Sequence, residues 1–209
     1  MKEYCMYNQS IEELEKAISK NDELLITDVW SDLSNYKEIE SILLKNGFKL
    51  YYKRPVYYKK VGKIKDSILI FKKGKALIKK MFSELLKKTE NMDFLEWKTD
   101  PAKSFKEIYS SNPRWNLCAY KDDELIGFLT LNFNEEINYG TIKLIYVKDE
   151  FRGKNYAAEL LKKAEELFLK AGINNWYEST HESNISMIKV FEKYGFKNKR
   201  DLIYFIRKK

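Results

Sequence analysis

Cysteine and histidine are scarce in this chain of 209 residues, which holds two cysteines and one histidine. Cys5 and Cys118 are too few for a disulfide framework, and neither belongs to a pair with metal-ligand spacing. With His181 as the only histidine, a metal site built on histidines or a Ser-His-Asp triad is close to excluded. The sequence therefore predicts no metal site.

Long apolar runs are also missing. No run approaches the roughly 20 residues that span a bilayer, and the first residues, Met1–Cys5, lack the apolar core of a signal peptide. Hydrophobic residues make up 44% of the chain and aromatic residues 15%, which indicates a globular protein with a core. We expect a cytoplasmic protein without a membrane partner.

Acidic residues are nearly absent from one stretch. Between Lys49 and Lys80 there are twelve lysines or arginines and one acid, Asp66, a local balance of +11 within a formal net charge of +8. The interleaved tyrosines are Tyr51, Tyr52, Tyr57 and Tyr58. Such a stretch could be a nucleic-acid surface, or edge strands whose lysines discourage pairing with another sheet. We favour edge strands and do not expect a nucleic-acid partner, because no nucleic-acid motif accompanies the charge.

The clearest pattern is a strand, a turn and a helix between residues 141 and 171. Thr141–Val147 is rich in β-branched and aromatic residues and predicts a strand with Ile142, Leu144 and Tyr146 on one face. Residues 157–171 carry apolar side chains at helical spacing, and Gly172 follows where a left-handed cap ends a helix.

The turn between this strand and helix has the features of an anion site. A helix that begins directly after a strand leaves its first backbone N–H groups unpaired and carries partial positive charge there, which suits phosphate. Gly153 lets the backbone approach a ligand, and Arg152 and Lys154 add cations. The alternative is an ordinary turn with two solvated basic residues.

Two segments resemble those of the GCN5-related N-acetyltransferase (GNAT) family. The run from Arg152 to Ala157 is similar to the family's Q/R-x-x-G-x-G/A loop for acetyl-coenzyme A, although Asn155 stands at the inner glycine. Asparagine tolerates left-handed backbone better than other non-glycine residues. The run 184–196 is similar to the family's N-x-x-(x)-A…Y-E-K-x-G-F segment along the pantetheine arm. Two motifs in the right order are far more specific than one.

The resemblance implies an α/β (α+β) fold, the GNAT acyl-CoA N-acyltransferase fold, with a mixed, mostly antiparallel sheet flanked by helices. It also implies acetyl-CoA as the acetyl donor, with its thioester arm between two strands that splay apart, one ending at Val147 and one beginning near Ile173. For Asn184, a helix N-cap is an alternative role that can coexist with binding. The cofactor-binding residues implied by the resemblance are Ile145, Tyr146, Val147, Arg152, Gly153, Lys154, Asn155, Tyr156, Ala157, Asn184 and Phe191.

The implied reaction is direct attack of a primary amine on the acetyl thioester in a ternary complex. It needs a base for the ammonium, a donor to the carbonyl and an acid for the thiolate. A backbone N–H at a bulge near Val147 is expected to serve the carbonyl. The family often has a tyrosine acid where this chain has Phe191, so Tyr194 is the candidate acid, with core packing as its alternative role. The candidate bases, acting through water, are Glu178, Glu135 and Glu136, and surface solvation explains the last two equally well.

Two other functions stay open. Because Asn155 and Phe191 depart from the family pattern, the protein could bind acyl-CoA without turnover, as a sensor or an assembly subunit. The basic stretch could belong to a nucleic-acid-associated module. The expected acceptor is a small-molecule or peptide amine that the sequence does not identify, and a homodimer is left open.

The sequence predicts two regions, a GNAT domain over residues 63–209 and a small αβ region over residues 1–62. In the αβ region, Ser10–Glu13 has capping-box spacing before a short helix. Further expected elements are a strand over Leu24–Val29, a helix over Tyr36–Lys45 and extended strands over Phe48–Lys60 that break near Pro55. In the GNAT domain we expect a strand over Ser67–Phe71, helices over 75–89 and Pro101–Ser110, and a hairpin of Arg114–Tyr120 with Glu124–Phe133.

The two ends of the chain share a pattern. The C-terminal order of strand, helix and strand, over 173–179, 184–194 and 196–207, matches that of the αβ region. In both, a glycine ends the helix and Phe-Lys follows, at Gly47 and Gly195, 148 residues apart (195 minus 47). We interpret residues 1–62 as a degenerate half-GNAT repeat without a phosphate loop. A chance similarity of two αβ units is the alternative.

Overall fold

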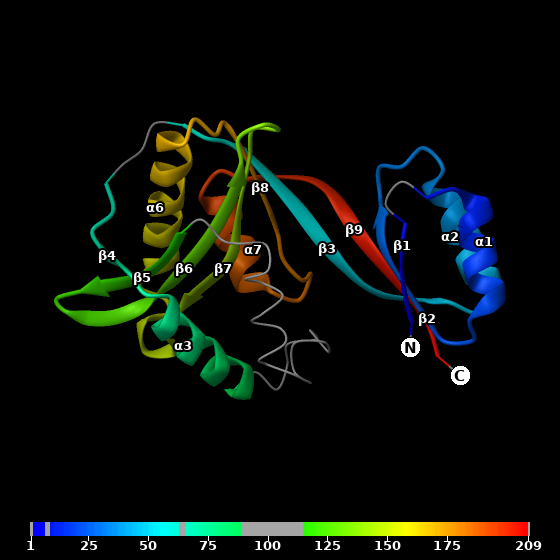
Figure 1. Cartoon of the computed structure of the whole chain (residues 1–209), viewed down its shortest axis with the longest axis horizontal. Helices are drawn as coiled ribbons and strands as arrows, with labels where there is room; N and C mark the ends of the chain where they lie inside the picture. The colour runs from blue at the N-terminus through cyan, green and yellow to red at the C-terminus, as the bar shows by residue number, and fades with distance from the viewer. Residues whose placement is uncertain (1, 7–8, 63–65, 89–114, 209) are drawn as a thin grey trace. The chain divides into compact units, whose positions relative to one another are not determined.

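The computed structural model describes residues 2–6, 9–62, 66–88 and 115–208 (Figure 1). The chain divides into two compact units, which are described separately. The terminal unit comprises residues 1–58 and 178–209, and the central unit comprises residues 59–177. The C-terminal segment thus shares a unit with the N-terminal region, and the proposed boundary at residue 62 lies near the division at 58. The predicted helix Pro101–Ser110 lies outside the described residues.

The central unit contains a mixed, mostly antiparallel sheet with the strand order β8-β7-β6-β5-β4. Only β7 and β8 are parallel, because α6 crosses over between them. The strands are β4 (Ile70–Lys73), β5 (Trp115–Lys121), β6 (Glu124–Asn134), β7 (Tyr139–Val147) and β8 (Asn175–Ser179), and the helices are α3 (Lys75–Lys88), the 3₁₀ turn η1 (Asp149–Phe151) and α6 (Tyr156–Lys170). This confirms the predicted fold class and the predicted hairpin of β5 and β6.

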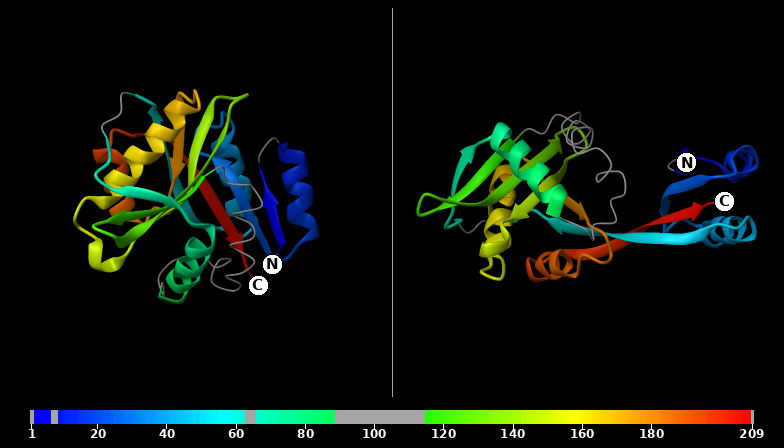
Figure 2. Two further views of the ribbon diagram at one scale, coloured as in Figure 1. Left: turned by 60° about the vertical axis from the view of Figure 1, so that its left-hand side comes forward. Right: turned by 90° about the horizontal axis from the view of Figure 1, so that it is seen from below.

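Helices α3 and α6 cover opposite faces of this sheet (Figure 2). On one face, Ile78 and Phe82 of α3 pack with Phe128 of β6. On the other, Phe168 of α6 lies 5.2 Å from Trp176, measured between ring centroids. A Cβ added at Gly140 would come within 2.7 Å of the same phenyl ring, so only glycine fits there.

A β-bulge in β7 corrects one sequence prediction. Thr130 pairs with Leu144, but the next residue of β6, Leu131, pairs with Ile142, so Lys143 is an extra residue. Successive residues of β6 point to opposite faces, and their partners therefore do so too. Ile142 and Leu144 lie on opposite faces of β7, and the prediction that they share one was wrong.

The terminal unit has the strand order β1-β2-β9-β3, in which β1 and β2 are parallel and the other neighbours antiparallel. Its elements are β1 (Lys2–Cys5), α1 (Ile11–Lys20), β2 (Leu24–Trp30), α2 (Tyr36–Lys45), β3 (Lys49–Lys60), α7 (Ile185–Lys193) and β9 (Lys197–Arg207). The core joins α1 and α2 to the sheet through Leu14, Ile18, Ile39, Leu43, Ile26, Val29, Ile203 and Phe205. The short strand β1 was not predicted.

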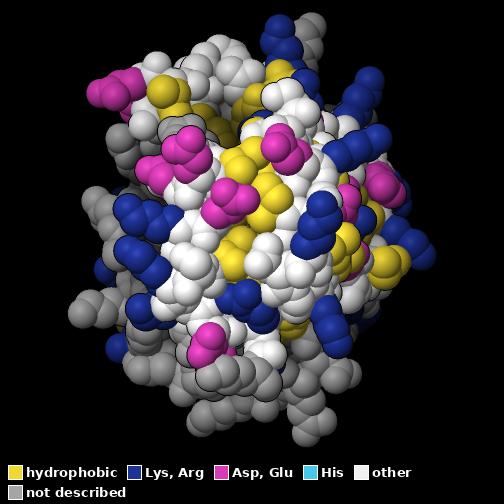
Figure 3. All heavy atoms as spheres, turned by 90° about the vertical axis from the view of Figure 1, so that its right-hand side faces the viewer, with side chains coloured by type: hydrophobic (Ala, Val, Ile, Leu, Met, Phe, Trp, Pro, Cys, Tyr) yellow, Lys and Arg dark blue, Asp and Glu magenta, His cyan; other side chains and the backbone are white. Residues whose placement is uncertain are grey.

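The basic strand β3 is neither broken at Pro55 nor an edge strand. Its pairing with β9 runs from Lys49 to Tyr58 and includes a pair between Pro55 and Asp201. On its other side, the main chain of Lys53 exchanges hydrogen bonds with Glu182 at 2.8 and 3.0 Å. The edge-strand interpretation is therefore wrong for the lysines of β3. It holds for Lys72 and Lys73 of the same basic stretch, because they lie on β4, the last strand of the central sheet. On the face shown in Figure 3, basic side chains are interspersed with acidic and apolar ones.

Candidate functional site

The turn before α6 adopts the left-handed geometry that the sequence suggested. Gly153 has a φ of +77°, and a Cβ added there would meet nothing within 4 Å. Asn155 is the helix N-cap and has a φ of 66° and a ψ of 11°. This is the left-handed region, which glycine enters freely and asparagine tolerates. The asparagine at the family's inner glycine position thus has a glycine-like backbone.

Five consecutive main-chain N–H groups at this turn have no acceptor among the described residues. The N–H of Arg152 donates to Asp149 O at 3.2 Å and that of Ala158 to Asn155 O at 3.1 Å. Between them, over residues 153–157, no N–H group donates to an acceptor in the described part of the chain. The side chain of Asn155 makes no capping hydrogen bond either. We call residues 153–157 the open turn; it combines unpaired donors with the positive end of the helix dipole.

Helix α1 of the terminal unit shows the closed alternative. Ser10 Oγ accepts the N–H of Glu13 at 3.2 Å, and the N–H of Ser10 donates to Glu13 Oε2 at 2.9 Å. This confirms the predicted capping box. The side chains of α1 thus accept two N–H groups at its start, those of Ser10 and Glu13, and Glu12 and Glu13 place negative charge in its first turn.

Basic side chains surround the open turn. The guanidinium of Arg152, whose side chain is 59% exposed, lies 3.0 Å from Asp149 and donates through Nε to Val147 O at 3.3 Å. Lys154 and Lys148 place their ammonium groups 5.4 and 5.2 Å from the ring centroid of Phe151. An exposed ion pair such as that of Arg152 contributes little stability, so the guanidinium can exchange its partner for a ligand.

Strands β7 and β8 separate as predicted. Their register consists of two pairs, Tyr139 with Asn175 and Gly140 with Trp176, and no later pair joins them in the described residues. The residues predicted to bind pantetheine, Ile145, Tyr146 and Val147, pair on their other side with Leu129, Phe128 and Gly127 of β6. The bulge of β7 lies at Lys143 and not near Val147, and the N–H group that serves the carbonyl stays a prediction.

The remaining candidates belong to the terminal unit. The side-chain oxygen of Asn184 accepts the N–H of Met187 at 3.2 Å, and its amide donates to Thr180 Oγ1 at 3.0 Å. Asn184 is therefore the N-cap of α7, as the alternative interpretation held. Phe191 is 2% exposed, and its ring centroid lies 5.5 Å from that of Tyr57. Neither observation tests a contact with acyl-CoA.

The two candidate catalytic residues differ in exposure. Glu178 is 5% exposed and alternates along β8 with Trp176, so the two share one face of the strand. Trp176 is fully buried. Tyr194 is half-buried at the end of α7, with its ring centroid 6.3 Å from that of Phe196.

His181 was not assigned a role from the sequence. It is 8% exposed, and its Nδ1 accepts the N–H of Ser183 at 3.1 Å while its ring lies 4.9 Å from Tyr52. A lone histidine gives no pattern in sequence that would reveal such a position. Among the described residues, no group of His, Cys, Asp and Glu could hold a metal ion. No described helix is long and apolar enough to cross a membrane.

Glu159 lies on α6, the helix that follows the open turn, and its hydrogen bonds make the stability of the fold depend on pH. It is 6% exposed and accepts the N–H of Ile68 at 3.0 Å and a hydrogen bond from Lys162 Nζ at 2.7 Å. Burial alone would raise its pKa, but these hydrogen bonds outweigh burial and lower the pKa below 4.5. A carboxyl with a lowered pKa stabilises the folded state above its unfolded pKa, and this contribution is lost as pH falls through the folded pKa.

We therefore expect Glu159→Gln to lower the free energy of unfolding by about 1 kcal/mol at pH 7. In urea denaturation, the difference from the unsubstituted protein should shrink as pH falls below 4.5, the ordinary glutamate value. The exposed Glu12→Gln serves as a control, with an expected change under about 0.5 kcal/mol. A difference that grows on acidification would contradict the assigned hydrogen bonds.

Comparisons with known proteins agree with this geometry. The chain is similar to a GCN5-related N-acetyltransferase from Sphaerobacter thermophilus, with 12% identity over 93% of this chain and 64% of that chain and a TM-score of 0.59. It is also similar to an acetyltransferase from the GNAT family from Colwellia psychrerythraea, with 12% identity over 94% and 72% of the two chains and a TM-score of 0.59. A tandem GNAT protein from the clavulanic acid biosynthesis pathway matches with 15% identity over 93% and 66% and a TM-score of 0.62.

At these identities the similarity to solved structures establishes the fold, and the chain spans less than two thirds of the Sphaerobacter protein. No curated protein matches the sequence. The sequence model of the acetyltransferase (GNAT) family, however, matches residues 76–196, more than half of the chain. The chain therefore belongs to the GNAT acetyltransferase family.

Proposed function

We propose that this protein is an acetyl-CoA-dependent N-acetyltransferase that acetylates a primary amine of a small molecule or peptide. One observation carries the proposal: in the part of the chain that the structure describes, no acceptor pairs with the five N–H groups of residues 153–157 at the start of α6. Oriented amides at the positive end of a helix suit a diphosphate. Membership of an acetyltransferase family supports acetyl transfer in general.

The residues present fit the donor's charged end. Backbone donors of Gly153–Ala157 would hold the diphosphate, and Arg152 and Lys154 would add charge beside it. Open space at Gly153 leaves room for close approach. Ile145–Val147 and Asn184 are the proposed contacts of the pantetheine arm. Acetyl-CoA would supply an activated acetyl group.

The proposed chemistry is a single displacement. The amine nitrogen forms a bond to the acetyl carbonyl carbon, and the bond from that carbon to sulfur breaks. The amine's proton leaves through water to Glu178, and the thiolate gains a proton from Tyr194. The acetylated amine and free coenzyme A thiol are the products. The cytoplasm remains the proposed compartment.

Two measurements, made one after the other, test the proposal. Calorimetry should detect binding of acetyl-CoA at micromolar concentrations, and absence of binding would reject the function. Release of free thiol should then appear with at least one amine from a panel of peptides, polyamines, aminoglycosides and small metabolites. Binding without release for any amine would favour the second candidate, a non-catalytic acyl-CoA sensor or assembly subunit. That candidate is favoured by the burial of Phe191 where the family often has its acid.

Tyr194→Phe tests the proposed acid. Because a thiolate is a modest base, with a thiol pKa of about 8.5, its protonation contributes near the low end of general acid catalysis, so we expect kcat to fall about tenfold. The KM for acetyl-CoA should stay within about twofold, and the basic limb of the pH profile should shift. The matched control is Tyr204→Phe, another half-buried tyrosine of the terminal unit. An unchanged kcat would assign Tyr194 to packing.

A further inference from the structure

Two bulges in the β3–β9 ladder occupy equivalent positions. The pairing skips Tyr51 on β3, between Leu50 and Tyr52, and it skips Lys199 on β9. In a regular antiparallel ladder, exchanging the two strands gives the same hydrogen-bond pattern for many choices of equivalent residues. A bulge marks one position on each strand, so two bulges show which residues are equivalent. Tyr51 and Lys199 are 148 residues apart, the same spacing that separates Gly47 from Gly195. The ladder is therefore two-fold symmetric about the pair Arg54–Leu202.

The helix ends preceding β3 and β9 repeat at the same spacing. Gly47 and Gly195 have φ values of +78° and +94°. Both helices end with matching main-chain hydrogen bonds. In α2, Gly47 N donates to Leu44 O and Phe48 N to Leu43 O, at 3.1 and 3.0 Å. In α7, Gly195 N donates to Glu192 O and Phe196 N to Phe191 O, both at 3.0 Å.

The loops that hold these strands are also equivalent. Lys53 N donates to the carboxylate of Glu182 at 2.8 Å, and Lys53 O accepts Glu182 N at 3.0 Å. Asp201, 148 residues beyond Lys53, donates through N to Ser31 Oγ and accepts Ser31 N, both at 2.9 Å. Each position is thus fixed by one residue that offers a main-chain donor and a side-chain acceptor. The bulges, the helix ends and the anchored strand positions repeat at a spacing of 148, and the anchoring residues Ser31 and Glu182 are 151 residues apart (182 minus 31). A chance likeness of two αβ segments would not reproduce all of these.

The segments that precede these helices also have the same connection in both copies. Strands β1 and β2 are parallel neighbours joined by α1, as β7 and β8 are joined by α6. The helices differ at their first turns, since the capping box of Ser10 closes α1 whereas residues 153–157 leave α6 open. The two copies therefore share a fold, but only the C-terminal copy has an open turn that could bind an anion.

We propose that residues 2–58 are a second, closed copy of the acyltransferase half, which pairs with β9 in place of a second subunit and leaves one acyl-CoA site per chain. Strand β9 has β2 on one side and β3 on the other, so neither of its edges can accept another copy. In a homodimer built with the same symmetry, residue i of one copy contacts residue j of the other and the reverse. Here the chain supplies both halves itself, and we infer a monomer.

Cysteine cross-linking tests which partner β9 has, using the full-length chain with the exposed Cys5 changed to serine. Leu202→Cys alone should stay monomeric under oxidation, because Arg54 and not a second Leu202 faces it. Leu202→Cys with Arg54→Cys should close within one chain, since paired strand residues have Cα separations suited to a disulfide. Tyr58→Cys with Lys197→Cys repeats the test away from the axis and serves if the first pair does not fold. A disulfide-linked dimer from Leu202→Cys alone would overturn the proposal.

Mass and stoichiometry complete the test, and the stoichiometry rests on the proposed function. Light scattering should give the chain mass of 25.0 kDa, and a mass of twice that value would contradict the monomer. Calorimetry should give one acetyl-CoA per chain. Two sites per chain would overturn the closed copy while leaving the proposed function intact. No binding would reject the proposed function, and the cross-linking result would still decide the repeat.

Discussion

Asn155→Asp is expected to weaken acetyl-CoA binding about 100-fold. The substitution preserves shape, and aspartate also tolerates the left-handed backbone that Asn155 adopts at a φ of 66°. It places a negative charge among the unpaired N–H groups of residues 153–157. Two like charges about 4 Å apart repel by about 4 kcal/mol at an effective dielectric constant near 20, so a 100-fold loss is a moderate estimate.

The structure offers a matched control. Asn35 is the N-cap of α2, and like Asn155 it makes no side-chain capping hydrogen bond. Asn35→Asp changes the net charge equally and should leave acetyl-CoA affinity within about twofold. Both substitutions put a carboxylate at a helix N-terminus, which favours the helix by about 0.3–1 kcal/mol. Thermal unfolding should therefore show neither variant to be less stable.

Calorimetry with acetyl-CoA at two salt concentrations provides the measurement. The deficit of Asn155→Asp should shrink at high salt, because salt screens exposed charges. Asn155→Gly, which installs the family's residue without charge, should bind as well as the unsubstituted protein. If the Asn155→Asp and Asn35→Asp variants bind acetyl-CoA with equal affinity, the open turn is not the diphosphate-binding site.

The sequence predicted the elements around this turn because their signals are local. The capping box at Ser10, the glycines after α2, α6 and α7 and the apolar periodicity of α6 depend on neighbouring residues alone, and each was found where expected. The strand β1 was missed because four residues carry too little periodicity. The bulge at Lys143 was missed because an extra residue in a strand leaves no compositional mark, although it moves Ile142 to the opposite face.

Properties that depend on distant pairing were predicted less well. The lysines of β3 indicate an edge strand only if its neighbours are unknown, and those neighbours lie more than a hundred residues away in sequence. The interpretation of residues 1–62 as a half repeat rested on one Gly-Phe-Lys match. It gains weight from ladder bulges that no sequence pattern displays. Tyr194 and Glu178 stay predictions, since their roles depend on a bound acceptor.

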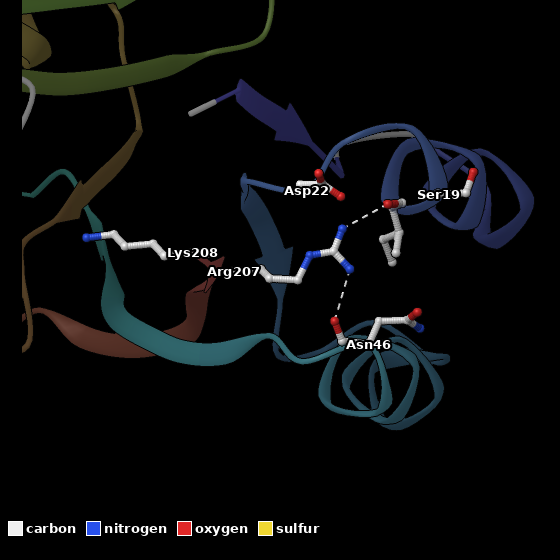
Figure 4. Close-up of a pocket in the computed structure, with 6 residues that line it drawn as sticks. Ser19, Asp22, Asn46, Arg207 and Lys208 are labelled. Atoms are coloured by element: carbon white, nitrogen blue, oxygen red, sulfur yellow. Dashed lines mark hydrogen bonds between the residues drawn. The ribbon is translucent and has the colours of Figure 1, made fainter.

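Arg207→Met is expected to destabilise the terminal unit by about 2–4 kcal/mol. Arg207 Nη1 donates to Asn46 O at 3.0 Å, and Nη2 donates to Ile18 O at 2.8 Å (Figure 4). Nη2 also donates to Asn21 O. These carbonyls belong to the C-terminal ends of α2 and α1, where unpaired acceptors and partial negative charge favour a cation. Hydrogen bonds to a charged group contribute about 1.5–3 kcal/mol each, with incomplete additivity.

Lys208→Met is the matched control, because it also removes one positive charge at the neighbouring position and Lys208 points away from the guanidinium in Figure 4. We expect it to change stability by less than about 0.5 kcal/mol. The stability of Arg207→Lys should lie between those of the two variants. Lysine keeps the charge, but its single ammonium lacks the planar fork with which the guanidinium reaches both helix ends.

Native-state hydrogen exchange separates the two units. Amides of β2 and β9, which lie in the terminal unit, should exchange faster in Arg207→Met, whereas those of β6 in the central unit should keep their protection. Equal acceleration in both units would show that they unfold together. Unchanged exchange of β2 and β9 would mean that the helix ends are satisfied without the guanidinium. Arg207 is the last residue of β9, and its side chain binds the ends of α1 and α2. We therefore expect its loss to unfold residues 2–58 first.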